Sequence, residues 1–113
     1  MKKIFVITFS ISILLIIACS KTNSSSTTTN CSGTQSFTTD VSPIFQSSCA
    51  LSGCHASGSS NGPGALTTYQ QIYNNRTAIR TAVANGTMPQ SGSLSTTQKN
   101  ILLCWIDNGA IGN

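Results

Sequence analysis

The segment Cys49-Ala50-Leu51-Ser52-Gly53-Cys54-His55 decides how the rest of this chain is interpreted. It holds two thiols with four residues between them, and an imidazole follows directly after the second thiol. His55 is the only histidine in the 113 residues, so any site that needs an imidazole must include this segment. The segment therefore predicts where the functional site lies.

Two cysteines followed directly by a histidine are typical of covalent haem attachment, in which the thiols become thioethers and the imidazole ligates the iron. The usual pattern has two residues between the cysteines, and here Gly53 gives the longer loop its flexibility. Two other interpretations stay open. One is a local disulfide between Cys49 and Cys54 beside an incidental histidine. The other is a zinc site with the ligands Cys31, Cys49, Cys54 and His55.

The amino-terminal residues have the three-part pattern of an export signal. A positively charged start precedes an apolar run over residues 4–17, and the small residue Ala18 precedes Cys19. This run is too short for a stable membrane span and is typical of a secretory signal. Residues 16–19 resemble the bacterial lipobox, which predicts a signal peptide over 1–18 and a lipid on Cys19. In the alternative, a simple peptidase cuts nearby and Cys19 is an ordinary thiol.

The segment after Cys19 has the composition of a linker. Residues 20–30 contain only Ser, Thr, Asn and one Lys, so they cannot bury apolar surface. We therefore expect the lipidated cysteine and a disordered polar tether over residues 19–30, followed by a folded domain over 31–113. A domain of that size is marginally stable unless a disulfide or a cofactor supports it.

The charge of the mature chain argues against nucleic acid as a partner. The whole chain has a formal net charge of +4, but two of its lysines lie in the export signal. Four basic residues against two acidic ones leave a charge of +2 after the signal is removed. Because these residues form no basic cluster, no nucleic-acid interface is expected.

The other cysteines can be assigned by counting. Exported thiols are usually oxidised or chemically committed. If Cys19 carries lipid and a haem takes Cys49 and Cys54, then Cys31 and Cys104 remain as an even pair. Their disulfide would close a loop of 74 residues and stabilise the domain by about 4 kcal/mol. Alternatively, Cys49 pairs with another cysteine and leaves Cys54 as a single haem attachment.

The folded part is predicted to be all-α, with three to five short helices. Ser/Thr-x-x-Gln capping boxes at residues 68–71 and 95–98 begin two helices, and a further helix is expected over 76–84. Residues 56–64 (ASGSSNGPG) form a loop by composition. No run alternates with period two for long enough to predict a strand.

The first helix is expected to begin at Thr39. Asp40 is a suitable cap, and Pro43 lies in the first turn, where its missing N–H costs little. One face of this helix is apolar and leads directly into the cysteine segment, with the residues Val41, Ile44 and Phe45.

Met88 is the candidate for a second axial ligand of the iron. It lies 33 residues after His55, far enough for the chain to cross a haem, and Pro89 stiffens the loop that presents it. The mature chain has no other methionine. A thioether ligand raises the reduction potential relative to a second histidine. The alternative is that Met88 fills a gap in the core.

The order of these motifs resembles small c-type cytochrome domains of exported bacterial lipoproteins. The resemblance covers nearly all of the chain after the tether and is carried by Asp40–Phe45, Cys49–His55, Leu66–Tyr69, Gly86–Pro89, Leu94–Ser95 and Trp105–Ala110. It implies a cytochrome c-like fold around one covalent haem c, with thioethers from Cys49 and Cys54 and axial ligands from His55 and Met88.

The same resemblance implies a carrier of single electrons and not an enzyme, because the iron performs the redox chemistry. Such a protein would be exported, lipid-anchored on the periplasmic face or at the outer membrane, and would exchange electrons with redox partner proteins. Two alternatives stay open. One is a haem-free, disulfide-bonded surface lipoprotein domain with an interaction or structural role. The other is a haem sensor or peroxidase-like domain with an open distal position.

Overall fold

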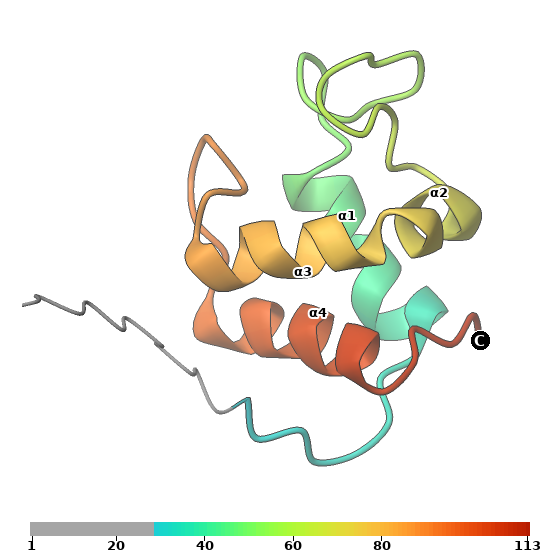
Figure 1. The fold of residues 1–113 in the computed structure, drawn as a ribbon, viewed down its shortest axis with the longest axis vertical. Coiled ribbons are helices and arrows are strands. Elements are labelled where there is room, and N and C mark those ends of the chain that lie inside the picture. The colour runs from blue at the N-terminus through green and yellow to red at the C-terminus, as the bar shows by residue number, and fades with distance from the viewer. Residues whose placement is uncertain (1–28) are drawn as a thin grey trace, which may run out of the picture.

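The computed structural model describes residues 29–113, so the predicted signal peptide and the lipid on Cys19 lie outside the described residues. The described part is helical and contains no strand, which confirms the predicted all-α class. None of its helices combines the length and the apolar composition that a membrane span needs. The elements, in chain order, are η1 (Phe37–Val41), α1 (Ser42–Ser48), α2 (Tyr69–Asn74), α3 (Arg76–Asn85) and α4 (Thr96–Asp107) (Figure 1).

Both predicted capping boxes begin a helix. At α2, the Thr68 hydroxyl accepts from the Gln71 N–H at 3.3 Å, and the Gln71 side chain accepts from the Thr68 N–H at 3.1 Å. At α4, Ser95 and Gln98 make the same reciprocal pair at 3.1 and 2.9 Å. Each box satisfies two backbone donors that the first turn would leave unpaired.

The first helical segment differs from the prediction at its start. A turn of π-helix, η1, precedes α1, and the cap of η1 is Ser36, whose hydroxyl accepts from the Thr39 N–H at 3.4 Å. Asp40 is therefore not the cap. Its carboxylate accepts from the Ser36 N–H at 2.8 Å, which makes it the reciprocal partner of the cap. Pro43 does lie in the first turn of α1, as predicted.

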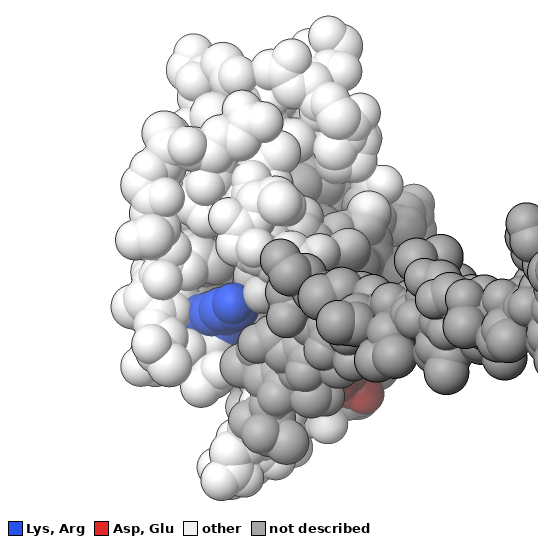
Figure 2. Space-filling view, turned by 60° about the vertical axis from the view of Figure 1, so that its left-hand side comes forward, with Lys and Arg blue, Asp and Glu red and all other residues white. Residues whose placement is uncertain are grey.

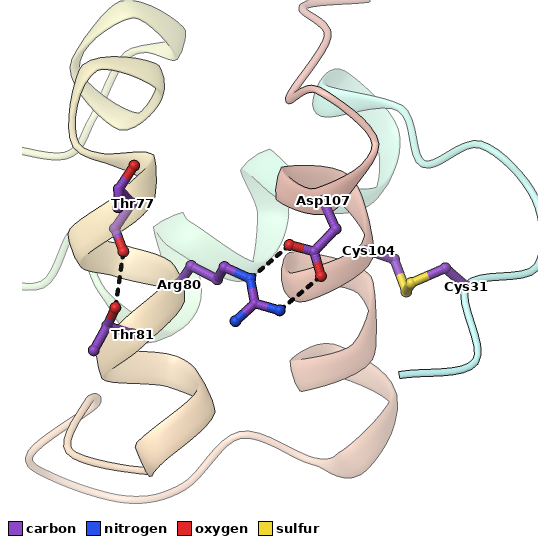
Figure 3. Close-up of polar contacts among 6 residues, drawn as sticks. All are labelled: Cys31, Thr77, Arg80, Thr81, Cys104 and Asp107. Atoms are coloured by element: carbon purple, nitrogen blue, oxygen red, sulfur yellow. Dashed lines mark hydrogen bonds and ion pairs between the residues drawn. A yellow bond between two sulfur atoms is a disulfide. The ribbon is translucent and has the colours of Figure 1, made fainter. Parts of the chain in front are cut away.

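Helices α3 and α4 pack side by side and run in opposite directions (Figure 1). Arg80 on α3 pairs with Asp107 on α4 through two hydrogen bonds of 2.5 and 2.9 Å (Figure 3). On α4, Cys104 forms a disulfide with Cys31 (Figure 3). This is the pairing that the sequence predicts if Cys49 and Cys54 attach a haem. Apolar side chains from all the elements meet behind these contacts and form the core, which includes Val41, Ile44, Phe45, Leu66, Ile72, Ile79, Val83, Leu102, Leu103 and Trp105.

Residues 110–113 pack against an aromatic cluster at the end of α4. The rings of Phe37 and Tyr69 are 5.1 Å apart, and those of Tyr69 and Trp105 are 6.4 Å apart. The Tyr69 hydroxyl donates to the carbonyl of Ala110, and the Trp105 indole N–H donates to the carbonyl of Ile111, both at 3.0 Å. These bonds satisfy the polar atoms of the buried rings.

Two long loops connect the helices on the other part of the domain. One runs from α1 to α2, over residues 49–68, and the other runs from α3 to α4, over residues 86–95 (Figure 1). Gly86 ends α3 with a φ of +70°, a left-handed conformation that glycine adopts at low cost. The loop predicted over residues 56–64 is present within the first of these segments.

Candidate functional site

The two loops enclose a pocket of about 410 Å³. This size lies within the range of small-molecule and cofactor sites. The four residues that the sequence assigns to a haem all line it: Cys49, Cys54, His55 and Met88. The rest of the lining consists of Ser48, Gly53, Asn61, Gly62, Pro89, Gln90 and Ser91. The structure therefore places Met88 in one pocket with three residues that lie 33 or more positions earlier in the chain.

The longer spacing between the cysteines is closed by main-chain hydrogen bonds. The His55 N–H donates to the Cys49 carbonyl at 3.1 Å, and the Cys54 N–H donates to the Leu51 carbonyl at 2.9 Å. Gly53 has a φ of +80°, a conformation that glycine adopts readily between these two bonds. We define residues 49–55, closed in this way, as the cysteine loop. Its first two N–H groups donate to the carbonyl of Phe45 in α1, which ties the loop to the helix.

His55 is held by its own backbone and by its ring. It is the only polar residue buried in the described part of the chain, with 8% of its surface exposed. Ring atom Nδ1 lies 2.9 Å from the carbonyl oxygen of Gly64. A carbonyl can only accept, so Nδ1 carries a proton, and in the neutral ring Nε2 then keeps its lone pair. In metal sites, a hydrogen bond from the ring nitrogen that does not bind the metal orients the ligating histidine in this way.

Cys49 and Cys54 are both free thiols. Burial, and to a lesser extent the neighbouring Cys54, raises the pKa of the Cys49 thiol to about 11, so it stays protonated at neutral pH. The local disulfide that the sequence left open is not formed. Because Cys31 is bonded to Cys104, neither of those cysteines is available to Cys49 or to a zinc site. Within residues 29–113, no group of three or more histidine, cysteine or carboxylate side chains is arranged to hold a metal ion.

Met88 lies in the wall of the pocket contributed by the α3–α4 loop. The amides of Thr87 and Met88 both donate to the carbonyl of Ala82, at 3.0 and 3.4 Å, which anchors the start of this loop to α3. Met88 is half-buried and also borders a smaller cavity of about 120 Å³ between this loop and α4. It is not among the buried core residues, so the gap-filling role does not describe its position.

The aromatic residues do not contribute to the pocket wall. Phe45 and Trp105 are buried and Tyr73 is half-buried, but none of the three lines the pocket. Trp105 packs against Phe37 and Tyr69, and its indole N–H donates to the carbonyl of Ile111.

Sequence reasoning missed several groups that shape the site. They belong to the loop over residues 56–64, which composition described only as irregular. The carbonyl of Gly64 carries no side-chain signal, whereas Asn61 and Ser59 have the polar side chains typical of turns that bond neighbouring backbone. Both side chains donate to the cysteine loop, as described below.

The pocket wall contains no charged side chain. Figure 2 shows a face of the described surface on which uncharged side chains predominate, with few Lys, Arg, Asp or Glu residues in view. The charged residues that are present make contacts of their own: Arg80 pairs with Asp107, and Lys99 donates to the carbonyl of Ala84 at 2.9 Å. A ligand of this pocket would therefore be held by sulfur, imidazole and neutral polar groups.

No protein-family model matches the chain, and no curated protein or solved structure shows significant similarity to it.

Proposed function

We propose that residues 31–113 form a monohaem c-type cytochrome domain that carries single electrons outside the inner membrane. The observation that carries this proposal is the shared pocket. Two reduced thiols, an imidazole with a free Nε2 and a thioether line one cavity, although they come from two separate loops. These are the donor types that attach a haem covalently and ligate its iron from two sides.

The residues present fit such a group. Cys49 and Cys54 would attach it, each adding its S–H across a vinyl double bond, with sulfur on one carbon and hydrogen on the other. This addition would need no oxidant, because the S–H hydrogen ends on the neighbouring vinyl carbon. His55 would ligate through Nε2 while Gly64 holds Nδ1. Met88 would supply the second axial ligand. When bound, the haem supplies reversible one-electron chemistry at its iron.

The proposed place of the domain in the cell rests on the sequence alone. We propose export by the signal over residues 1–18, a lipid anchor at Cys19 and a polar tether before the domain. The domain would then exchange electrons with redox partner proteins near a membrane surface. The uncharged wall of the pocket provides no basic or acidic cluster for steering such a partner by charge.

Visible absorption of the full chain tests the proposal. The protein should be expressed in bacteria that mature c-type cytochromes and purified with its anchor. We expect a Soret band, and we expect the haem to stay with the polypeptide after denaturation, because the thioethers are covalent. A Cys49→Ala, Cys54→Ala double variant should release any haem on denaturation. A wild-type spectrum without a Soret band would overturn the proposal.

Met88→Ala tests the second axial ligand. Removing the thioether should lower the reduction potential and allow carbon monoxide to bind the reduced protein readily. Gln90→Ala is the matched control, because Gln90 lines the same pocket on the same loop and has no ligating sulfur. If Met88→Ala left both the potential and carbon monoxide binding at wild-type values, the distal position would already be open. The domain would then be a haem sensor or a peroxidase-like domain.

A further inference from the structure

The loop after His55 folds back over the cysteine loop and bonds to it through side chains. The Asn61 amide Nδ2 donates to the carbonyl of Gly53 at 2.8 Å and, at 3.4 Å, to that of Cys54. The Ser59 hydroxyl donates to the same carbonyl of Cys54. The two side chains thus hold two consecutive carbonyls at the end of the cysteine loop that precedes His55.

Asn61 also connects these carbonyls to the partner of the histidine ring. Its backbone N–H donates to the Ser59 hydroxyl at 3.2 Å, and its carbonyl accepts from the Gly64 N–H at 3.0 Å. Gly64 in turn accepts from Nδ1 of His55. One residue therefore links the backbone beside Cys54, the Ser59 hydroxyl and the group that orients the imidazole.

The end of this loop, at Leu66, is also held in place. The Leu66 N–H donates to the His55 carbonyl at 2.9 Å, and the Leu66 side chain is buried with 3% of its surface exposed. The segment from His55 to Leu66 is consequently closed at its base, while Ser59 and Asn61 bind its middle to the cysteine loop. Such a closed, internally bonded loop can position another backbone segment although its own surface is exposed.

We infer that Ser59 and Asn61 are positioning residues for covalent attachment, and we call the pair the Ser59–Asn61 clamp. The inference rests on the proposed function. Four residues between the cysteines give the loop more freedom than two would, and the clamp removes that freedom beside Cys54. Both thiols then keep the fixed separation that attachment to one rigid ring requires. Ser59 does not line the pocket, and Asn61, which does, would act through the backbone carbonyls beside Cys54.

Asn61→Asp is the most discriminating variant. The carboxylate has nearly the same shape as the amide but cannot donate to a carbonyl. Asn61→Ala and Ser59→Ala remove the same bonds by truncation. Two matched controls are Ser60→Ala, an exposed serine of the same loop, and Asn74→Ala, an exposed asparagine whose side chain bonds to Gln70 on α2.

The first measurement is the number of thioethers in the matured full chain, counted by mass spectrometry after denaturation. Loss of a hydrogen bond changes an equilibrium by a few-fold to about ten-fold. We therefore expect Asn61→Asp and Asn61→Ala to lower the ratio of doubly to singly attached haem about three- to ten-fold. The controls should keep the wild-type ratio. Unchanged attachment in both Asn61 variants would overturn the clamp.

The second measurement needs no haem, so it tests the clamp separately from the proposed cytochrome function. In the full chain produced without haem maturation, the amides of Cys54 and His55 should exchange with solvent about three- to ten-fold faster in the Asn61 variants than in wild type. Exchange in α4 should not change. Wild-type rates at both amides would overturn the clamp. If the wild type never acquired haem, the proposed function would fail, while amide exchange would still decide whether the clamp holds the loop.

Discussion

The domain has two sides that are held together by different means. We call η1, α4 and residues 110–113 the packed side, and residues 49–66 and 86–94 the pocket side. The packed side contains the buried residues 102–105 of α4, packs the rings of Phe37 and Trp105 against Tyr69 of α2, and is closed by a disulfide. On the pocket side, only His55 and Leu66 are buried, and backbone carbonyls, glycines and short polar side chains set the conformation.

This difference indicates that one side mainly stabilises the fold and the other mainly positions the candidate site. Burial of apolar surface supplies most of the stability of a small domain, and of the twelve buried apolar residues six lie on the packed side and one, Leu66, lies on the pocket side. The pocket side contributes little burial, but it fixes the positions of individual polar atoms and thiols. Changes on the packed side should therefore lower the free energy of unfolding, whereas changes on the pocket side should mainly alter the site.

The largest expected effect comes from the disulfide. A Cys31→Ala, Cys104→Ala double variant should lose about 4 kcal/mol of unfolding free energy, because the unfolded chain regains the freedom of a long loop. Urea unfolding measures this loss. Ser91→Ala, on the pocket side, is the control and should change the free energy by less than about 0.5 kcal/mol. Equal effects of the two changes would remove the distinction between the sides.

Gly112→Ala should cost about 1–3 kcal/mol through overpacking. A Cβ at this position would lie 2.7–3.0 Å from three carbons of the Tyr69 ring, which is itself packed against Phe37 and Trp105. Thermal or urea unfolding measures the loss. Ile111→Ala is the neighbouring control, since its side chain is 56% exposed. A neutral Gly112→Ala would mean that residues 110–113 do not pack tightly on the aromatic cluster.

Ser95→Ala should cost about 1 kcal/mol, because it removes the capping box that begins α4. Ser93→Ala lies two residues earlier, on the pocket side, and is exposed. It should leave the unfolding midpoint unchanged. The pair compares a pocket-side serine with the cap of α4 within one loop, and a larger loss from Ser93→Ala than from Ser95→Ala would contradict the comparison.

The smallest effect concerns the exposed ion pair between α3 and α4. The hydrogen bonds from Arg80 lower the pKa of Asp107 in the folded protein. The stabilisation is therefore present above the unfolded pKa of about 4 and is lost as pH falls through the lower folded value. Because 43% of the Arg80 side chain and 34% of the Asp107 side chain are exposed to solvent, the stabilisation should amount to less than about 1 kcal/mol. Urea unfolding at pH 7 and at pH 3 measures this effect. Between these pH values the free energy of unfolding should fall less in Asp107→Asn than in wild type. If it falls equally in both proteins, the ion pair contributes nothing to stability.

The sequence predicted the helices of the domain better than its loops. The capping boxes at Thr68 and Ser95 are local signals, since all their partners lie within three residues, and both helices begin where these boxes place them. The start of η1 was missed because Asp40 can either cap a helix or bond back to a cap, and the spacing to Ser36 favours the second. The packing of Gly112 on Tyr69 depends on distant residues and has no local signal.

The sequence predicted which residues line the candidate site, but not which groups hold these residues in place. The unique histidine lies beside two cysteines, and Met88 is the only methionine after the predicted signal peptide, so these residues could be found by type. The structure lines one pocket with all of them. The carbonyl of Gly64 could not be identified in the same way, because every residue has a carbonyl. The Ser59–Asn61 clamp lies in a loop whose composition indicates turns but not their contacts.

The most direct test of the central claim is the mass of the polypeptide fragment that contains Cys49 and Cys54. The full chain should be matured in bacteria that attach c-type haem, then reduced, alkylated and digested. We predict that this fragment carries the mass of one haem and that neither thiol is alkylated, while Cys31 and Cys104 both are. A fragment without haem, in which Cys49 and Cys54 are both alkylated, would contradict the account.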